Sequence, residues 1–238
     1  MAQVHMQQEQ DQALIYARGL QKRYQSGESR VMALDHVNLK IMRGEYVVLS
    51  GRSGSGKTTL LNMFGALDRP DSGALEIAGR DLLTMSNAER ADFRLHHVGF
   101  VFQAYNLIRV LTARENVAYV LQLRGIPRRR REKLAQDWLA QVGLADLAER
   151  RPDQMSGGQQ QRVAVARALA SEPDLILADE PTANLDSRTG EGLMELMQRL
   201  NREQGTTFVI ASHDPAVIAS ARTRITMQDG RIVECVRT

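Results

Sequence analysis

Residues 51–58 are Gly-Arg-Ser-Gly-Ser-Gly-Lys-Thr, a spacing that can hold a chain of phosphates. Glycines let backbone N–H groups curl around a phosphate, and the start of a following helix adds positive potential. In this pattern Lys57 reaches the β- and γ-phosphates, and the Thr58 hydroxyl binds Mg²⁺. A purely structural glycine turn is the alternative. The pattern predicts a nucleotide-binding loop formed by Gly51, Ser53, Gly54, Ser55, Gly56, Lys57, Thr58 and Thr59.

Two acidic residues, Asp179 and Glu180, directly follow the apolar run Leu175–Ala178. A carboxylate at the tip of a buried strand can hold Mg²⁺, usually through water, beside a phosphate loop. We assign this role to Asp179. Glu180, one residue further on, is placed to accept a proton from an attacking water. With the phosphate loop, this pair predicts hydrolysis of a nucleoside triphosphate.

The elements that must position these residues form an alternating pattern. Tyr46–Ser50 is a continuous apolar run, as expected of a buried parallel strand. The glycine loop follows it, and Thr59–Leu67 then has apolar residues on one helical face. Strand, glycine turn and helix in this order are half of a βαβ unit. Further strands are expected at Ala13–Ala17, Val37–Ile41, Leu75–Ile77, Val98–Phe102, Leu175–Ala178 and Thr207–Ala211.

The remainder of the chain is predicted to contain a helical insertion and a terminal hairpin. Helix is expected from Ala104 to about Ala164, most clearly at Glu115–Leu123 and Glu132–Val142, and again at Gly190–Glu203. Asp229-Gly230 is a typical hairpin turn between two short strands. These patterns predict an α/β fold in which a helical insertion splits a parallel sheet. We expect one domain, 1–238, with a core of 10–103 and 165–238 and a helical subdomain of 104–164.

Composition limits the class of protein. The 238 residues carry a net charge of +3, and 43% are hydrophobic, as in ordinary soluble domains. No apolar stretch approaches the roughly 18–20 residues that span a bilayer, and the polar start predicts no signal peptide. The single cysteine, Cys235, cannot form an internal disulfide, which fits a reducing cytoplasm. Arg128–Arg131 is either a solvated helix start or a contact for lipid headgroups or a membrane partner.

The segment Met155–Gln159 resembles the signature sequence of ATP-binding cassette (ABC) ATPases, with methionine in place of the usual leucine. Gln160–Ala168 also matches that family. A two-glycine turn that opens a helix is itself an anion site. The resemblance implies a head-to-tail homodimer, in which the signature of each subunit closes on the γ-phosphate of ATP bound to the other. The signature residues that would contact the nucleotide are Ser156, Gly157, Gly158 and Gln159.

The same resemblance implies further roles. Gln103 matches the Q-loop glutamine, which senses Mg²⁺ and the γ-phosphate, and His213 matches the switch histidine. Asp186 matches the D-loop aspartate at the dimer seam. Tyr24 matches the aromatic residue that stacks on adenine, although a lone tyrosine can also serve packing. The implied architecture is the P-loop NTPase fold of ABC ATPases: a mostly parallel sheet core, an antiparallel β subdomain and an α-helical signature subdomain.

Two stretches, Leu177–Asp186 and Phe102–Leu107, resemble the bacterial lipoprotein-releasing and macrolide-exporting ATPases. This implies a cytoplasmic subunit at the inner membrane, a separate integral-membrane permease, and a periplasmic adaptor as a further partner. Tyr105, Leu107 and Ile108 would anchor the permease, or would form the base of the helical insertion. One rival is an ATPase switch on a non-transporting membrane partner. A soluble ABC ATPase acting on nucleic acid is the other, but the chain lacks a long coiled coil and a second cassette, so we expect no nucleic-acid partner.

Overall fold

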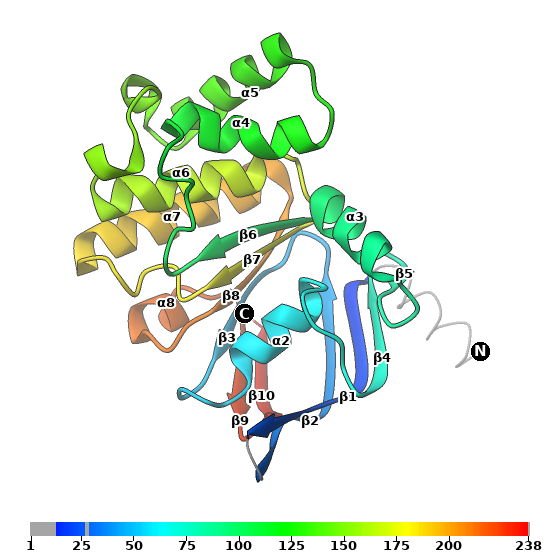
Figure 1. The fold of residues 1–238 in the computed structure, drawn as a ribbon. Helices are drawn as coiled ribbons and strands as arrows, with labels where there is room; N and C mark the ends of the chain where they lie inside the picture. The colour runs from blue at the N-terminus through cyan, green and yellow to red at the C-terminus, as the bar shows by residue number, and fades with distance from the viewer. Residues whose placement is uncertain (1–12, 27–28, 238) are drawn as a thin grey trace.

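The computed structural model describes residues 13–26 and 29–237, which form two sheets covered by helices (Figure 1). The larger sheet has the strand order β10-β9-β3-β8-β7-β6. Strands β3, β8, β7 and β6 are parallel neighbours, β9 runs parallel to β3, and β10 is antiparallel to β9. Their bounds are β3 Tyr46–Ser50, β6 Val98–Phe102, β7 Leu175–Asp179, β8 Thr207–Ala211, β9 Thr223–Gln228 and β10 Arg231–Arg237.

The smaller sheet is antiparallel, with the order β2-β1-β4-β5. It consists of β1 (Ala13–Ser26), β2 (Ser29–Met42), β4 (Ser72–Ile77) and β5 (Arg80–Asp81). Its apolar side chains share one buried cluster with helix α2 (Lys57–Phe64) and with one face of the larger sheet. The small sheet is therefore fixed directly against the helix that follows the phosphate loop.

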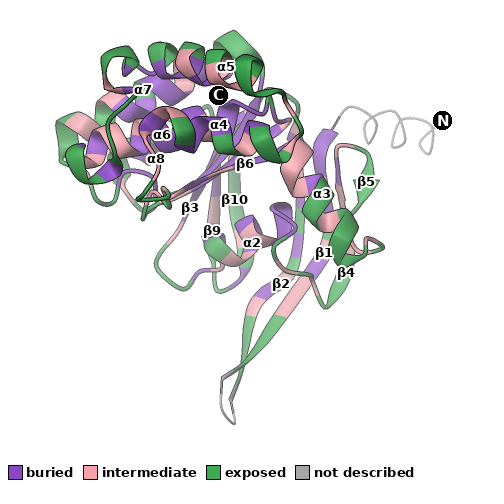
Figure 2. Cartoon of the chain, turned by 45° about the horizontal axis from the view of Figure 1, so that its top comes forward, coloured by how far each residue is buried: buried purple, intermediate pink, exposed green. Residues whose placement is uncertain are grey.

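Helices cover the other face of the larger sheet. They are α4 (Ala113–Leu123), α5 (Arg128–Gln141), α6 (Gly157–Leu169), α7 (Ser187–Gln204) and α8 (Pro215–Ala219), with short 3₁₀ turns at Ala145–Leu147 and Pro152–Gln154. A second buried cluster joins these helices to Val48, Ile176 and Ile210 of the sheet. Figure 2 shows the inner strands of this sheet buried, the edge strand β10 exposed and the outer side of α5 exposed. The two faces of the sheet thus carry separate helical layers.

The predicted architecture is confirmed, and three strands have the predicted bounds: β3, β6 and β8. The predicted helix from Ala104 onward is wrong at its start, because helix begins only at Ala113. Tyr105 and Asn106 have φ angles of 61° and 50°, which a right-handed helix cannot include. The fully buried Asn116 holds this loop through hydrogen bonds with the backbone of Ile108 and Leu111.

The helices differ from the predicted pattern in some places and agree with it in others. Helix α3 (Asn87–His97), which starts with a Ser86 capping box, lies outside the predicted pattern. Arg128–Arg131 form the first turn of α5, in agreement with a helix start there. The predicted boundary at 164/165 falls inside α6, so the division into core and helical subdomain stays a prediction. Within the described residues, no helix combines the length and apolarity needed to cross a membrane.

Candidate ATP-binding and hydrolysis site

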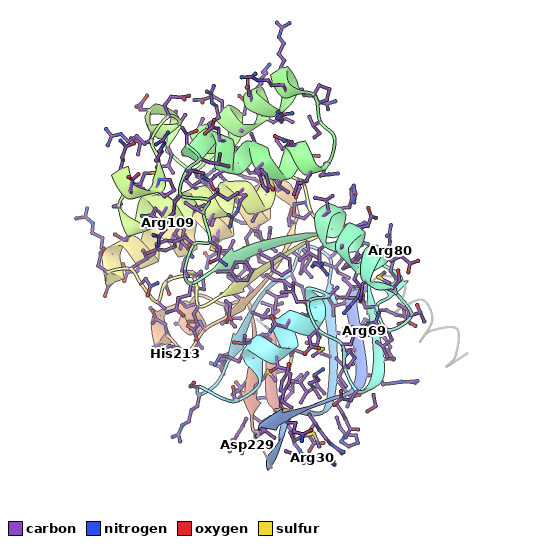
Figure 3. The ribbon with its side chains drawn as sticks, in the orientation of Figure 1. Arg30, Arg69, Arg80, Arg109, His213 and Asp229 are labelled. Atoms are coloured by element: carbon purple, nitrogen blue, oxygen red, sulfur yellow. The ribbon has the colours of Figure 1, made fainter. Side chains whose placement is uncertain are left out.

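The carboxyl ends of β6 and β7 point toward the side that holds the loop preceding α2 (Figure 1). His213, which follows β8, lies on this side too (Figure 3). Carboxyl ends of parallel strands are where open α/β sheets bind ligands, because loops and helix starts converge there. The sheet therefore brings the phosphate loop, the acidic pair and His213 to one edge.

The phosphate loop requires its glycines. Gly51, Gly54 and Gly56 have φ angles of 147°, 80° and 103°, which side chains rarely adopt. A Cβ at Gly56 would lie 2.5 Å from the Ala33 carbonyl oxygen, and one at Gly51 would collide with the Met227 carbonyl oxygen. Strands β2 and β9 therefore pack tightly against the loop, and only glycine fits at Gly51 and Gly56.

Lys57 is turned back into the loop. Its side chain is buried, and its ammonium donates hydrogen bonds to the carbonyl oxygens of Gly51 (2.7 Å) and Arg52 (3.2 Å). Ser55 is also buried, yet its hydroxyl has no hydrogen-bond partner in the structure. A buried polar atom without a partner is costly unless a ligand satisfies it. The loop therefore fits a phosphate group, with the Lys57 charge held within it. Ser53 and Gly54 are exposed in the same loop.

The two predicted cation ligands lie side by side. The Thr58 hydroxyl donates to Asp179 Oδ1 over 3.3 Å, across 121 residues of sequence. Burial raises the pKa of Asp179, and the nearby negative charge of Glu180 raises it further, although Thr58 and Lys57 act in the opposite direction. A half-buried carboxylate next to another carboxylate suits a divalent cation. Thr58 and Asp179 therefore form a donor set that fits Mg²⁺.

Glu180 is held by two residues from the end of the neighbouring strand. Its Oε1 lies 2.7 Å from Nδ1 of His213, and its Oε2 accepts a hydrogen bond from the buried Ser212 hydroxyl at 3.2 Å. Glu180 has a φ of 46°, a conformation uncommon outside glycine. The turn after β7 and the two hydrogen bonds thus fix the orientation of the carboxylate.

Gln103 lies at the end of β6, next to the strand that carries Asp179. The register pairs Phe102 with Asp179. The Gln103 amide donates to Asn184 Oδ1 at 3.4 Å, and Asn184 donates back to the Gln103 carbonyl oxygen at 2.9 Å. The predicted Mg²⁺ and γ-phosphate sensor is therefore tied to the segment that precedes Asp186. Asp186 itself caps α7, and hydrogen bonds from Thr189 hold its pKa below the ordinary value.

Ser156 caps α6, with a reciprocal pair of hydrogen bonds to Gln159. Both signature glycines are closely packed: a Cβ at Gly157 would lie 2.7 Å from the Tyr105 hydroxyl, and one at Gly158 would collide with the Thr189 side chain. Helix α6 belongs to one buried cluster, whereas α2 belongs to the other, across the sheet. The signature and the phosphate loop of one chain therefore start helices on opposite faces of the sheet.

Tyr24 lies near the end of β1 and is 38% exposed. Its hydroxyl donates to Asp68 at 2.7 Å. Of the predicted residues, the structure groups most directly Lys57, Thr58, Asp179, Glu180 and His213, through hydrogen bonds and charge interactions between neighbours. Sequence reasoning missed Ser212, Asn184 and Asp68. Ser212 and Asn184 stand next to or within predicted motifs, which is the signal that could have indicated them.

A strand, a glycine loop, a helix and a second strand tipped by Asp-Glu define this protein as a P-loop nucleoside triphosphatase. Residues 34–183 match the ABC transporter family, and the chain belongs to that family. It is an ATP-binding ATPase domain.

Individual relatives and solved structures are consistent with this family. LolD of Geobacter metallireducens, a lipoprotein-releasing system ATP-binding protein, is 42% identical over 93% of this chain and 98% of its own length. MacB 1/2 of Paracoccus denitrificans, a macrolide export ATP-binding/permease protein, is 46% identical over 94% of this chain. The chain spans only 34% of that longer relative. Among solved structures, the dimeric cassette MJ0796 bound to ADP and Pi has a TM-score of 0.85 and 41% identity, and covers 94% of this chain and 98% of its own.

Proposed function

We propose that the chain works as a head-to-tail homodimer around two ATP molecules and drives a separate permease of the lipoprotein-release or macrolide-export type. The observation that carries this proposal is the placement of the phosphate loop and the signature helix on opposite faces of one sheet. Each can bind an anion, because a helix starts at each of them. A second copy, turned head to tail, brings the signature of one chain to the nucleotide of the other.

The relatives support a dimer, since the solved MJ0796 structures similar to this chain are described as dimeric. Ser156 is exposed at the start of α6, and a residue that contacts a second chain must be exposed in the single chain. Asp186 is exposed as well, at the start of α7. Both predicted dimer contacts are therefore on the surface of the single chain.

At the site, Glu180 accepts the proton of a water aligned for in-line attack on the γ-phosphate. Lys57 and the signature serine of the second chain stabilise the charge that develops on the phosphate oxygens. Mg²⁺, held by Thr58 and Asp179 with Gln103 as its sensor, supplies further charge stabilisation when bound. His213 and Gln103 report the presence of the γ-phosphate. Tyr24 stacks on the adenine ring, and the other loop residues contact the phosphates.

A cavity of about 410 Å³ near the start of the Gln103 loop supports docking of a permease segment. Its apolar lining includes Phe100, Phe102 and Val120, and Leu67 at its rim is 46% exposed. Asn106 lines it too, next to the predicted anchor Tyr105. The Tyr105 side chain itself points its hydroxyl at Gly157. The loop after Gln103 therefore connects the proposed γ-phosphate sensor with both the signature and the docking cavity.

We place the complex at the cytoplasmic face of the bacterial inner membrane, with a periplasmic adaptor as a further partner. The names of LolD and MacB support a membrane partner for this chain. A test is to purify the tagged chain from detergent-solubilised bacterial membranes and identify what co-purifies. A permease with a large periplasmic domain supports the proposal. A membrane protein without a transport pathway favours the regulatory switch, and co-purifying nucleic acid favours the soluble alternative.

A further inference from the structure

The side chain of Tyr24 is connected to the segment that follows α2. Its phenol donates to Asp68 Oδ2 at 2.7 Å, and Asp68 lies four residues beyond the last residue of α2. Helix α2 begins with Lys57 and Thr58 of the phosphate loop. The proposed adenine platform is therefore anchored just beyond the helix that begins with the phosphate-binding residues.

Asp68 is itself held in place. Lys22 donates to Asp68 Oδ1 at 2.9 Å, and the backbone N–H of Arg69 donates to the same oxygen at 2.7 Å. Lys22 also donates to the Arg69 carbonyl oxygen at 2.7 Å. Arg69 lies beside β1 and β4 in Figure 3. Although partial burial acts to raise it, hydrogen bonds from Lys22, Tyr24 and Arg69 hold the pKa of Asp68 below its ordinary value. Asp68 is therefore an ionised acceptor at neutral pH.

Lys22 also covers the ring of Tyr24, with its ammonium 5.2 Å from the ring centroid. A cation over one face of an aromatic ring is attracted to it and leaves the other face for a different partner. Burial first, and then the hydrogen bond to Asp68, raise the pKa of Tyr24 to about 12. The phenol thus stays protonated at neutral pH and remains a donor. Tyr24 is 38% exposed, and its hydroxyl is held by Asp68.

We infer that Asp68 is a positioning residue, which holds the Tyr24 ring in the orientation that stacks on the adenine of ATP. This inference rests on the proposed ATP site. Ordering a mobile surface tyrosine on binding costs conformational entropy, which weakens the affinity for ATP. A ring that is already fixed carries no such cost. Asp68 acts at the adenosine end of the nucleotide, through the Tyr24 phenol.

The test compares full-length wild type with Asp68→Ala, Tyr24→Phe and the double variant, by ATP affinity, KM and kcat. Each single change should raise KM and the Kd for ATP about three- to tenfold, which is the cost of ordering one side chain, and should leave kcat within about twofold. Because both changes break one hydrogen bond, the double variant should be no weaker than the weaker single variant. Asp68→Asn, which keeps an acceptor oxygen, should recover part of the affinity.

A second readout separates positioning from general damage to the site. Inorganic tripolyphosphate binds the phosphate loop without an adenine ring, so its inhibition constant should be the same in wild type and Asp68→Ala. Equal weakening of tripolyphosphate and ATP would overturn the inference, and so would additive losses in the double variant or unchanged ATP affinity in Tyr24→Phe. Tyr24→Phe removes only the hydroxyl of an exposed side chain, so it tests the inference even if Asp68→Ala fails to fold. A wild-type chain that does not bind ATP would instead contradict the proposed function.

Discussion

The carboxylate of Glu180 and the imidazole of His213 form a direct contact, with Oε1 2.7 Å from Nδ1. The two residues lie after adjacent parallel strands, β7 and β8, whose register pairs Asp179 with Ala211. Glu180 is mostly buried, with 18% of its side chain exposed, whereas 68% of the His213 side chain is exposed. The proposed base is therefore held by a residue that can itself respond to a bound γ-phosphate.

Glu180→Gln should abolish hydrolysis and leave ATP binding intact. The amide keeps the size of the side chain but cannot accept a proton, and loss of a general base typically costs about 10²–10⁴-fold in rate. With hydrolysis blocked, an ATP-bound dimer should accumulate. Phosphate release and light scattering with ATP and Mg²⁺ measure the two effects. Turnover within a few-fold of wild type would refute the assignment of Glu180 as base.

His213→Ala should lower kcat without a matching loss of ATP affinity. The change removes one of the two contacts that orient Glu180, and the Ser212 hydroxyl remains as the other. Because the two residues act as a unit, Glu180→Gln with His213→Ala should be no slower than Glu180→Gln alone. Single-turnover rates of the three variants check this. Multiplicative losses in the double variant would show that His213 acts independently of Glu180.

Asp179→Asn should stabilise the nucleotide-free chain while it abolishes Mg²⁺-dependent hydrolysis. Burial and the charge of Glu180 raise the folded-state pKa of Asp179 above its unfolded value. Its ionisation therefore costs stability, a cost that is absent below the unfolded pKa and grows as the pH rises through the folded pKa. The free energy of unfolding at neutral pH should rise by on the order of 0.5–2 kcal/mol, as when a destabilising functional residue is replaced.

Denaturant unfolding of wild type and Asp179→Asn at several pH values measures this gain. It should be largest near pH 7 and shrink as the pH falls toward about 4, the ordinary pKa of aspartate. A gain that does not change with pH, or a loss of stability at pH 7, would contradict the electrostatic account of Asp179. Asp186→Asn is not a suitable control, because hydrogen bonds lower the pKa of that carboxyl.

Leu67→Asp should prevent co-purification of the permease, because Leu67 is an exposed apolar residue that lines the docking cavity. An unpaired charge buried at that surface should cost on the order of a few kcal/mol of binding free energy. Nucleotide affinity should stay unchanged. Leu123→Asp is a matched control, since Leu123 is 55% exposed on α4 and is not among the residues that line this cavity. Equal loss of the permease in both variants would argue against docking at the cavity.

The central strands and the phosphate loop could be predicted because their signals are local. β3, β6 and β8 are short apolar runs, and the loop is a contiguous motif. The predicted helix over Ala104–Thr112 is a loop instead, because the side chain of Asn116, in the following helix, hydrogen-bonds its backbone. Asp68 and Ser212 act through partners that are farther away, by 44 and 32 residues. Contacts of this kind follow from the fold and have no local pattern.

The central claim is that each ATP site combines the phosphate loop of one chain with the signature of another, and cysteine cross-linking tests it most directly. The one native cysteine, Cys235, is exposed and would be replaced by serine in the Glu180→Gln background. Subunits with Arg52→Cys are mixed with subunits with Ser156→Cys, and a short bifunctional thiol reagent is added with and without ATP. We expect a covalent heterodimer that requires ATP. No heterodimer in the mixture, together with a link inside single chains that carry both cysteines, would contradict the account.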